Sequence, residues 1–242
     1  MRTVGIVQAR MTSTRLPGKV LMEVLDKPLL EYELERLRRV VSLDDLVVAT
    51  TTNREDDPVV ALCERLAVPV YRGSENDVLS RYYEAAALFR ADAVVRFTAD
   101  CPLIDPLLSH ALIGYYLENR DKYDYCATSH ATYPRGIDTE ACSFTALEEA
   151  HREGITQAER EHVTYFIHSR PERYRIYRMD SGQEWGQYRL TVDTPEDFEL
   201  IKQIIEKLYP ADPCFDLAKI IHLLQINPDL LTINSKIRQK ET

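Results

Sequence analysis

Short runs of apolar, mostly β-branched residues alternate with segments of helical periodicity through the first half of the chain. The apolar runs lie at residues 3–9, 46–51, 69–72 and 92–98. The segments after them carry apolar residues three and four positions apart, and they cover residues 28–41, 58–66, 77–90 and 105–117. This alternation predicts an α/β fold, in which a mostly parallel, twisted sheet has helices on both faces.

The second half of the chain is less regular. Extended runs are expected at residues 123–129, 173–179 and 186–194, and helices at 143–153, 156–169 and 195–208. We therefore expect a single domain over residues 1–226 with a small irregular lobe in its second half. A polar tail is expected over residues 227–242.

The composition limits the class of protein. The 242 residues carry a formal net charge of -9, whereas a protein that binds nucleic acid usually has a basic excess. The five cysteines are scattered and odd in number, which indicates free thiols in a reducing compartment. No stretch approaches the roughly 20 apolar residues of a membrane span, and the run at residues 4–7 is too short for a signal peptide. We expect a cytoplasmic protein with no nucleic-acid or membrane partner.

The segment QARMTSTRLPGK after the first strand concentrates positive charge in an acidic protein. Arg10, Arg15 and Lys19 lie close together with Ser13 among them, and no acidic residue precedes Glu23. In parallel α/β sheets the loops after the strands share one edge, where ligands bind. Cationic, hydroxyl and backbone donors in one turn are typical of a phosphate-binding loop, although no hydroxyl residue follows the lysine as in a Walker A motif. The alternative is a solvated basic loop paired with surface carboxylates.

Two aspartates that follow extended runs are candidate metal ligands. Asp100 lies just past a strand, and Mg²⁺ usually takes one or two protein carboxylates together with phosphate oxygens. Asp105 precedes Pro106 and is better explained as the N-cap of the next helix. Asp193 precedes a helix that begins at Pro195, so it is explained equally well as a cap or as a metal ligand.

Other polar segments could line a site. They are residues 71–83 and 133–140, together with Arg160 and His162 of the segment EREHV. A lone histidine on a helix is more often structural or exposed than catalytic. Cys101 has no evident histidine partner and is interpreted as a packing residue.

The segments IVQARMTSTRLPGKVL, TADCPLIDP and LTVDTPEDFELI, in this order, resemble the cytidylyltransferases that make CMP-activated acidic sugars. These are the acylneuraminate and 3-deoxy-manno-octulosonate cytidylyltransferases. RGSENDVLSRY, YPRGIDTE and EREHVT are similar to stretches of the branch involved in spore coat polysaccharide biosynthesis. The resemblance covers about residues 1–208 and implies a Rossmann-like, GT-A-like nucleotidyltransferase fold. It also implies transfer of CMP from CTP to a sugar-like acceptor, with release of pyrophosphate, in the biosynthesis of a cell-surface or spore-coat polysaccharide.

The resemblance implies roles for the residues of the first loop and for the two aspartates. Arg10 and Lys19 would bind the phosphates of the nucleotide, with Ser13 and Arg15 beside them. The catalytic residues would be Arg10, Lys19 and Asp100, the aspartate after the fourth predicted strand.

The same resemblance assigns the metal. Asp100 and Asp193 would hold Mg²⁺, with Mn²⁺ as the alternative. For Asp193 this implication favours the metal ligand over the cap.

The resemblance also implies positions for the base and the acceptor. Arg72 and the backbone at Ala9 would lie near the cytosine. The acceptor would contact Tyr133, Arg135, Asp138, Arg160 and His162. One departure is Ala99, where the acidic-sugar enzymes usually have a glycine before the first metal aspartate, and the acceptor loops also differ, so the acceptor stays open.

A homodimer is a further implication of the resemblance, with acceptor and dimerisation elements within about residues 123–185.

Two other functions stay open. A metal-dependent glycosyltransferase that uses a nucleotide-sugar would typically carry a D-x-D motif at a strand end, and the chain has none with that spacing and place. A non-catalytic nucleotide-binding subunit would not need the two aspartates.

Overall fold

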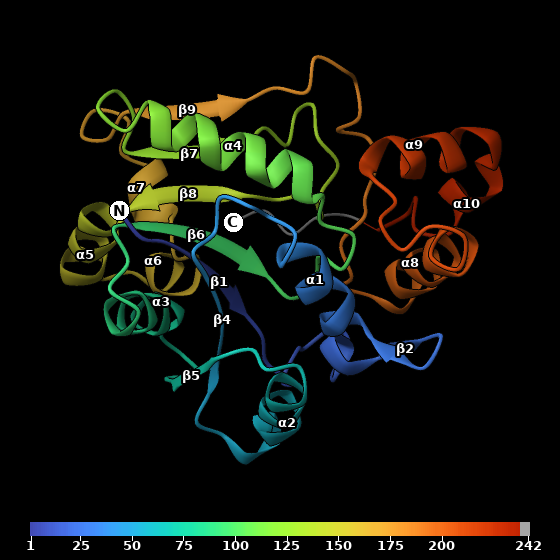
Figure 1. Ribbon diagram of the computed structural model, residues 1–242, viewed down its shortest axis with the longest axis horizontal. Coiled ribbons are helices and arrows are strands. Elements are labelled where there is room, and N and C mark those ends of the chain that lie inside the picture. The colour runs from blue at the N-terminus through green and yellow to red at the C-terminus, as the bar shows by residue number, and fades with distance from the viewer. Residues whose placement is uncertain (238–242) are drawn as a thin grey trace.

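The computed structural model describes residues 1–237, which fold around one seven-stranded sheet (Figure 1). In spatial order the strands are β5 (Val70–Gly73), β4 (Asp45–Thr51), β1 (Thr3–Gln8), β6 (Ala93–Thr98), β8 (Glu140–Ser143), β7 (Tyr125–Thr128) and β9 (Ile176–Met179). Neighbouring strands are parallel except around β8, which runs antiparallel to both β6 and β7. The predicted α/β fold with a mostly parallel sheet is confirmed.

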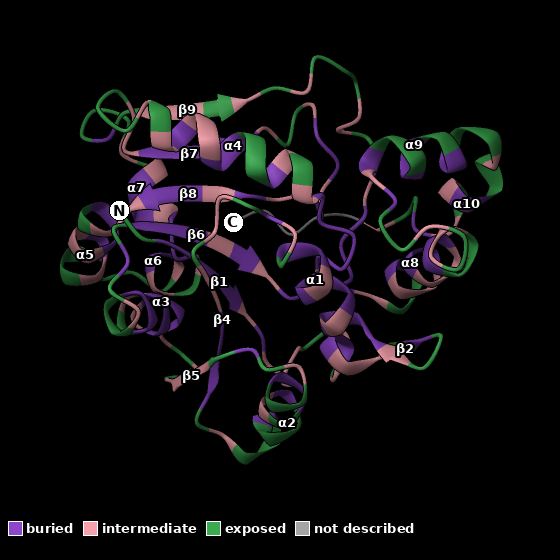
Figure 2. Cartoon of the chain, viewed as in Figure 1, coloured by how far each residue is buried: buried purple, intermediate pink, exposed green. Residues whose placement is uncertain are grey.

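Helices cover both faces of the sheet. One face carries α1 (Leu29–Leu37), α2 (Asp57–Arg65) and α4 (Pro106–Glu118). The other carries α3 (Val78–Leu88), α5 (Phe144–Glu153) and α7 (Tyr165–His168), with α6 (Gln157–Glu161) against α3. The central strands between these layers are buried (Figure 2), as a sheet covered on both faces requires. None of the helices in residues 1–237 is both long and apolar enough to cross a lipid bilayer.

A third apolar cluster forms a lobe beside the sheet, at the right of Figure 1. Its helices are α8 (Pro195–Leu208), α9 (Leu217–Ile226) and α10 (Pro228–Thr232). The short elements that remain are η1 (Lys19–Leu21), η2 (Arg54–Asp56) and the hairpin of β2 (Glu23–Val24) and β3 (Lys27–Pro28). The lobe packs on Tyr32 of α1 and on the segment that carries Leu190 and Val192, and so fixes that segment beside the sheet.

The polar tail predicted from residue 227 is wrong in its first part. α10 buries Leu230 in the third cluster. The side chain of Asn234 is buried and donates to Asp197 Oδ1 at 2.9 Å and to the carbonyl oxygen of Arg189 at 3.1 Å. These contacts hold the chain to the domain through Asn234, and residues 238–242 of the predicted tail lie outside the described residues.

Two other predictions need correction, and one strand was not predicted. The run 186–194 forms no strand, because its backbone bonds to loops, with Leu190 N donating to Arg135 O at 2.7 Å. β8 is missed, because four residues give too short a pattern. The helix predicted over 156–169 is two helices, α6 and α7, because the backbone leaves helical geometry at His162 (φ -104°, ψ 63°).

Candidate active site

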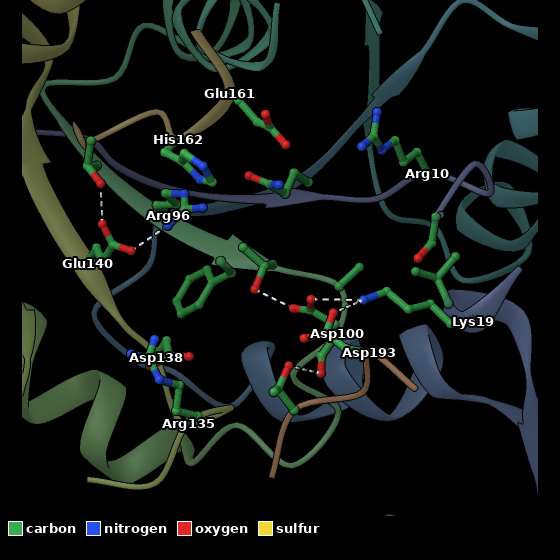
Figure 3. Close-up of a pocket in the computed structure, with 18 of the residues that line it drawn as sticks. Arg10, Lys19, Arg96, Asp100, Arg135, Asp138, Glu140, Glu161, His162 and Asp193 are labelled. Carbon is green, nitrogen blue, oxygen red and sulfur yellow. Dashed lines mark hydrogen bonds and ion pairs between the residues drawn. The ribbon is translucent and has the colours of Figure 1, made fainter. Parts of the chain in front are cut away.

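The carboxyl ends of β1 and β6 open into a cavity of about 430 Å³ (Figure 3). The two strands are parallel neighbours with Gln8 opposite Thr98, so the loops that follow them meet at this edge, as the sequence predicts. The predicted site residues that line the cavity are Arg10, Ser13, Arg15, Lys19, Asp100, Arg135, Asp138, His162 and Asp193.

Lys19 joins the two predicted metal ligands. Its Nζ lies 3.0 Å from Asp100 Oδ2 and 2.9 Å from Asp193 Oδ1 (Figure 3). It also donates to the carbonyl oxygen of Val192 at 2.6 Å. Gly18, with a φ of 73° that favours glycine, turns the chain immediately before η1, which begins at Lys19. Groups far apart in the sequence therefore meet at one ammonium.

Asp193 is not the cap of the helix that follows it. Thr194 is the N-cap of α8, and its hydroxyl accepts from Asp197 N in a capping box. Asp193 is left to face the cavity, where Oδ1 forms an ion pair with Arg15 at 2.8 Å and Oδ2 accepts from Arg189 at 2.9 Å. Two arginines and Lys19 thus orient this carboxylate.

The charges of this cluster shift one another's pKa. Burial alone would lower the pKa of Lys19, but the carboxylates of Asp100 and Asp193 raise it above its ordinary value. Burial alone would raise the pKa of Asp100, but Lys19 and the Thr98 hydroxyl, 2.6 Å from Asp100 Oδ1, lower it. Glu33 is fully buried nearby, and burial together with the charge of Asp100 raises its pKa well above the usual value. Asp100 and Lys19 are therefore charged at neutral pH.

Asp100 and Asp193 suit a divalent cation. Both carboxylates approach the same cationic atom, Lys19 Nζ, and so converge on one point. Carboxylate oxygens are ligands that Mg²⁺ and Mn²⁺ prefer. Within residues 1–237 no three His, Cys, Asp or Glu side chains are placed to hold a metal by themselves. The pair is therefore suited to a metal that completes its coordination with substrate phosphates and water.

The opposite wall of the cavity carries a partly buried ion pair. Arg96 of β6 pairs with Glu140 of β8, and their side chains are 16% and 15% exposed (Figure 3). Glu140 also accepts hydrogen bonds from the hydroxyls of Tyr125, at 2.8 Å, and Thr164. Burial opposes its ionisation, but Arg96 and these hydroxyls lower the pKa of Glu140 to about 2. This wall therefore carries charges of both signs at neutral pH.

Replacing Glu140 tests how far this pair stabilises the domain. Because the pKa of Glu140 is lowered from 4.5 to about 2, its stabilisation is complete above about pH 4.5 and is lost as the pH falls towards 2. We expect Glu140→Gln to lower the free energy of unfolding by about 3 kcal/mol at pH 7. Urea unfolding between pH 7 and pH 3 should show the difference from wild type shrinking as the pH falls.

Glu153→Gln is the matched control for that experiment. The pKa of Glu153 is also lowered to about 2, mainly by hydrogen bonds from Arg173 and Arg152, but the group is on the surface. Solvent screens such pairs, so its loss should change the unfolding midpoint far less. Equal effects of the two substitutions would contradict the structural role of the pair between Arg96 and Glu140.

Arg72 lies away from the cavity. Its guanidinium donates to the carbonyl oxygens of Thr51, at 2.8 Å, and Asn53, at 2.7 Å, and pairs with Asp57 at 2.8 Å. These contacts fix the loop between β4 and α2. Arg72 does not line the large cavity, and its predicted position near the cytosine stays a prediction.

Three further predicted residues do not line the large cavity. Tyr133 packs in the third apolar cluster and Arg160 pairs with Asp77 at 3.4 Å. Ala9 lines a smaller cavity that adjoins the large one.

Several lining residues were not singled out from the sequence, although Gln8 and Glu140 lie in segments that it offered as candidates. They are Gln8, Arg96, His130, Glu140, Glu161, Thr164, Tyr165 and His168. Arg96 carried a usable signal, because it interrupts the apolar run DAVVRFT of a buried strand. The others lie in short polar segments, and their convergence depends on β8 and on the break between α6 and α7.

Three comparisons with known proteins bear on this site. The family model described as cytidylyltransferase matches residues 4–234. An uncharacterized protein of Methanocaldococcus jannaschii is 38% identical, over 99% of this chain and 97% of the relative. The spore coat polysaccharide biosynthesis protein SpsF of Bacillus subtilis is 34% identical, over 94% of this chain and 95% of the relative. The structure of a cytidylyltransferase from Leptospira borgpetersenii superimposes with a TM-score of 0.91, at 31% identity, over all of both chains.

Proposed function

The chain belongs to the cytidylyltransferase family, and we propose that it transfers a cytidylyl group from CTP to a sugar-like acceptor with release of pyrophosphate. The observation that carries the proposal is the convergence of two carboxylates and a basic loop at one edge of the sheet. Asp100 and Asp193 meet at Lys19, and Arg10, Ser13 and Arg15 of the same loop line the same cavity.

The basic loop would bind the triphosphate. An acceptor oxygen attacks the α-phosphorus, the bond from that phosphorus to the bridging oxygen breaks, and pyrophosphate leaves with the electron pair. Arg10, Arg15 and Lys19 would neutralise the charge that develops on the phosphate oxygens, which is where most catalysis of phosphoryl transfer arises. Arg15 and Lys19 are held at the wall of the cavity by their ion pairs with Asp193 and Asp100, so they are in place before a nucleotide would bind.

Asp100 and Asp193 would hold the metal, Mg²⁺ or Mn²⁺. When bound there, the metal supplies Lewis-acid polarisation of the phosphate oxygens. Arg15 and Arg189 hold the Asp193 carboxylate in place, and Thr98 holds that of Asp100. Lys19, which pairs with both carboxylates here, would bind phosphate oxygens once the carboxylates held the metal.

The acceptor would occupy the far end of the cavity. Arg135 and Asp138 lie there in Figure 3, apart from Lys19, and His130 Nδ1 is 3.0 Å from Asp138 Oδ1. Hydrogen-bonding and charged groups of both signs suit a polyhydroxylated, sugar-like molecule. Tyr133 and Arg160 do not line the cavity, so their predicted contact with the acceptor would need the acceptor to extend beyond it. The relative SpsF supports a polysaccharide pathway for the product.

Pyrophosphate release tests the proposal. The full chain is incubated with Mg²⁺, CTP and a panel of sugar acids, sugar phosphates and neutral sugars. We expect pyrophosphate only when CTP and one acceptor class are both present. Turnover of a nucleotide-sugar without free CTP would instead support a glycosyltransferase, and CTP binding with no turnover on any acceptor would support a binding subunit. The homodimer stays a prediction.

A further inference from the structure

Lys19 lies at the point where the two predicted metal ligands converge (Figure 3). Its Nζ is 3.0 Å from Asp100 Oδ2 and 2.9 Å from Asp193 Oδ1, and it donates to the carbonyl oxygen of Val192 at 2.6 Å. Mg²⁺ binds carboxylate oxygens at about 2.0–2.1 Å, so an ion bound to both of these oxygens would lie next to the ammonium. Like charges that close repel strongly, and the ammonium and a metal therefore compete for this position.

The other oxygens of the two carboxylates also have donors in the protein. Asp100 Oδ1 accepts from the Thr98 hydroxyl at 2.6 Å, and Asp193 Oδ2 accepts from Arg189 at 2.9 Å. Arg15 forms a second ion pair with Asp193 Oδ1, at 2.8 Å. Cations of the protein thus already neutralise the two carboxylates, and a free divalent cation would gain little by approaching them.

Two of these cations face the cavity and one is anchored behind it. Lys19 and Arg15 line the cavity in which the phosphates of a nucleotide would lie. Arg189 does not line it, and its Nε donates at 2.8 Å to Oδ1 of the buried Asp197. Phosphate oxygens would therefore draw Lys19 and Arg15 away from the carboxylates, whereas Arg189 would keep the Asp193 carboxylate in place.

We propose that Lys19 takes the place of the metal until a nucleotide binds, so that free divalent cations are excluded and the metal enters together with the triphosphate. The inference rests on the proposed use of CTP and a metal. It gives Lys19 a role before the reaction, because two facing carboxylates would repel each other without a cation between them. Metal and nucleotide must then be coupled, and each raises the affinity of the protein for the other.

The test measures binding of Mn²⁺ alone, with no nucleotide, from the decrease of the electron paramagnetic resonance signal of free Mn²⁺. We expect Lys19→Met to bind Mn²⁺ about 10- to 100-fold more tightly than wild type, because methionine leaves the two carboxylates without the cation between them. Asp100→Asn added to Lys19→Met should abolish this gain, which places the gained affinity at the carboxylate pair.

Lys27→Met is the matched control. Lys27 Nζ is 2.7 Å from Glu35 Oε1, and Lys27 does not line the cavity, so this variant should bind Mn²⁺ as wild type does. Arg15→Met is a second variant, which decides the matter if Lys19→Met does not fold, and it should show a smaller gain. Thermal unfolding gives a second readout. Without nucleotide, Mn²⁺ should raise the Tm of Lys19→Met and leave that of wild type unchanged.

The inference and the proposed function fail in different experiments. Wild type that binds Mn²⁺ as tightly as Lys19→Met does, or folded Lys19→Met and Arg15→Met variants that both bind it no better than wild type, would overturn the inference. Cytidylyl transfer would be untouched by these results, because it is tested by pyrophosphate release from CTP with an acceptor. Failure of that assay would instead overturn the proposed function, whatever the Mn²⁺ titrations give.

Discussion

Asp100→Asn should lower the turnover number by about 10³ at saturating CTP and metal. The substitution keeps the size of the side chain but removes the charge that would hold the metal against the phosphates. Metal polarisation of a phosphoryl group contributes several kcal/mol to the transition state, and about 4 kcal/mol corresponds to a factor of roughly 10³. Initial rates of pyrophosphate release, measured over a range of Mg²⁺ and Mn²⁺ concentrations, give the turnover number directly.

Asp105→Asn is the control for Asp100→Asn. Asp105 lies in the same stretch, but its Oδ1 accepts from Leu107 N and Leu108 N at the start of α4, and its Oδ2 accepts from Leu217 N at 2.7 Å. Its loss should lower the Tm and leave the turnover number of the folded enzyme close to wild type. Comparable losses of turnover in the two variants would contradict the role of Asp100.

Lys19→Met should lower kcat/KM for CTP by about 10² to 10³. Lys19 is the cation through which both predicted metal ligands are joined, and its ammonium would neutralise the leaving pyrophosphate. Removal of one charged or polar donor aimed at developing negative charge typically costs this much. Steady-state rates at several CTP concentrations separate the loss in kcat from the change in KM.

Lys27→Met is the control that removes a lysine–carboxylate ion pair outside the cavity. Lys27 Nζ is 2.7 Å from Glu35 Oε1 and donates to the hydroxyl of Tyr209, and Lys27 does not line the cavity. Its replacement should leave kcat/KM within a factor of about two, as is usual for changes remote from the reacting groups. A Lys19→Met variant with near-wild-type kcat/KM would exclude the assigned role.

The residues that follow β1 and β6 can be predicted from sequence to share one site, because parallel strands place the loops after them at the same edge of the sheet. A buried strand followed by QARMTSTRLPGK and another followed by TADCPLIDP must present both loops at one sheet edge. The cap at Asp105 follows from the proline that begins the helix, and the structure confirms it. The local pattern and the global fold agree at these positions.

The structure of the second half of the chain cannot be predicted in the same way, because its elements are held by contacts between residues far apart in the sequence. The segment that delivers Asp193 is extended, but its backbone bonds to loops around Arg135 and Asp100, which no strand pattern reveals. Glu140 meets Arg96 only because β8 inserts antiparallel between β6 and β7. A four-residue strand carries too little periodicity to predict such an insertion.

The two arginines of the segment YRGSENDVLSRYY show the remaining ambiguity. The resemblance of motifs implies Arg72 for the base, and this stays a prediction. Within residues 1–237, Arg72 donates to backbone carbonyls, whereas Nε and Nη1 of Arg81 are buried without a hydrogen-bond partner. The helical phase offers a clue, since Arg81 falls on the same face of α3 as the buried residues Val78 and Ala85. A charged residue on that apolar face indicates a special role, but periodicity alone does not name its ligand.

Calorimetric titration of wild type and Asp100→Ala with CTP, UTP, ATP and GTP, each with and without Mg²⁺, is the most direct test of the central claim. The account predicts that wild type binds CTP in preference to the other three nucleotides. It also predicts that this binding weakens sharply when Mg²⁺ is chelated or Asp100 is replaced. Equal affinity for all four nucleotides, or CTP binding indifferent to both Mg²⁺ and Asp100, would contradict it.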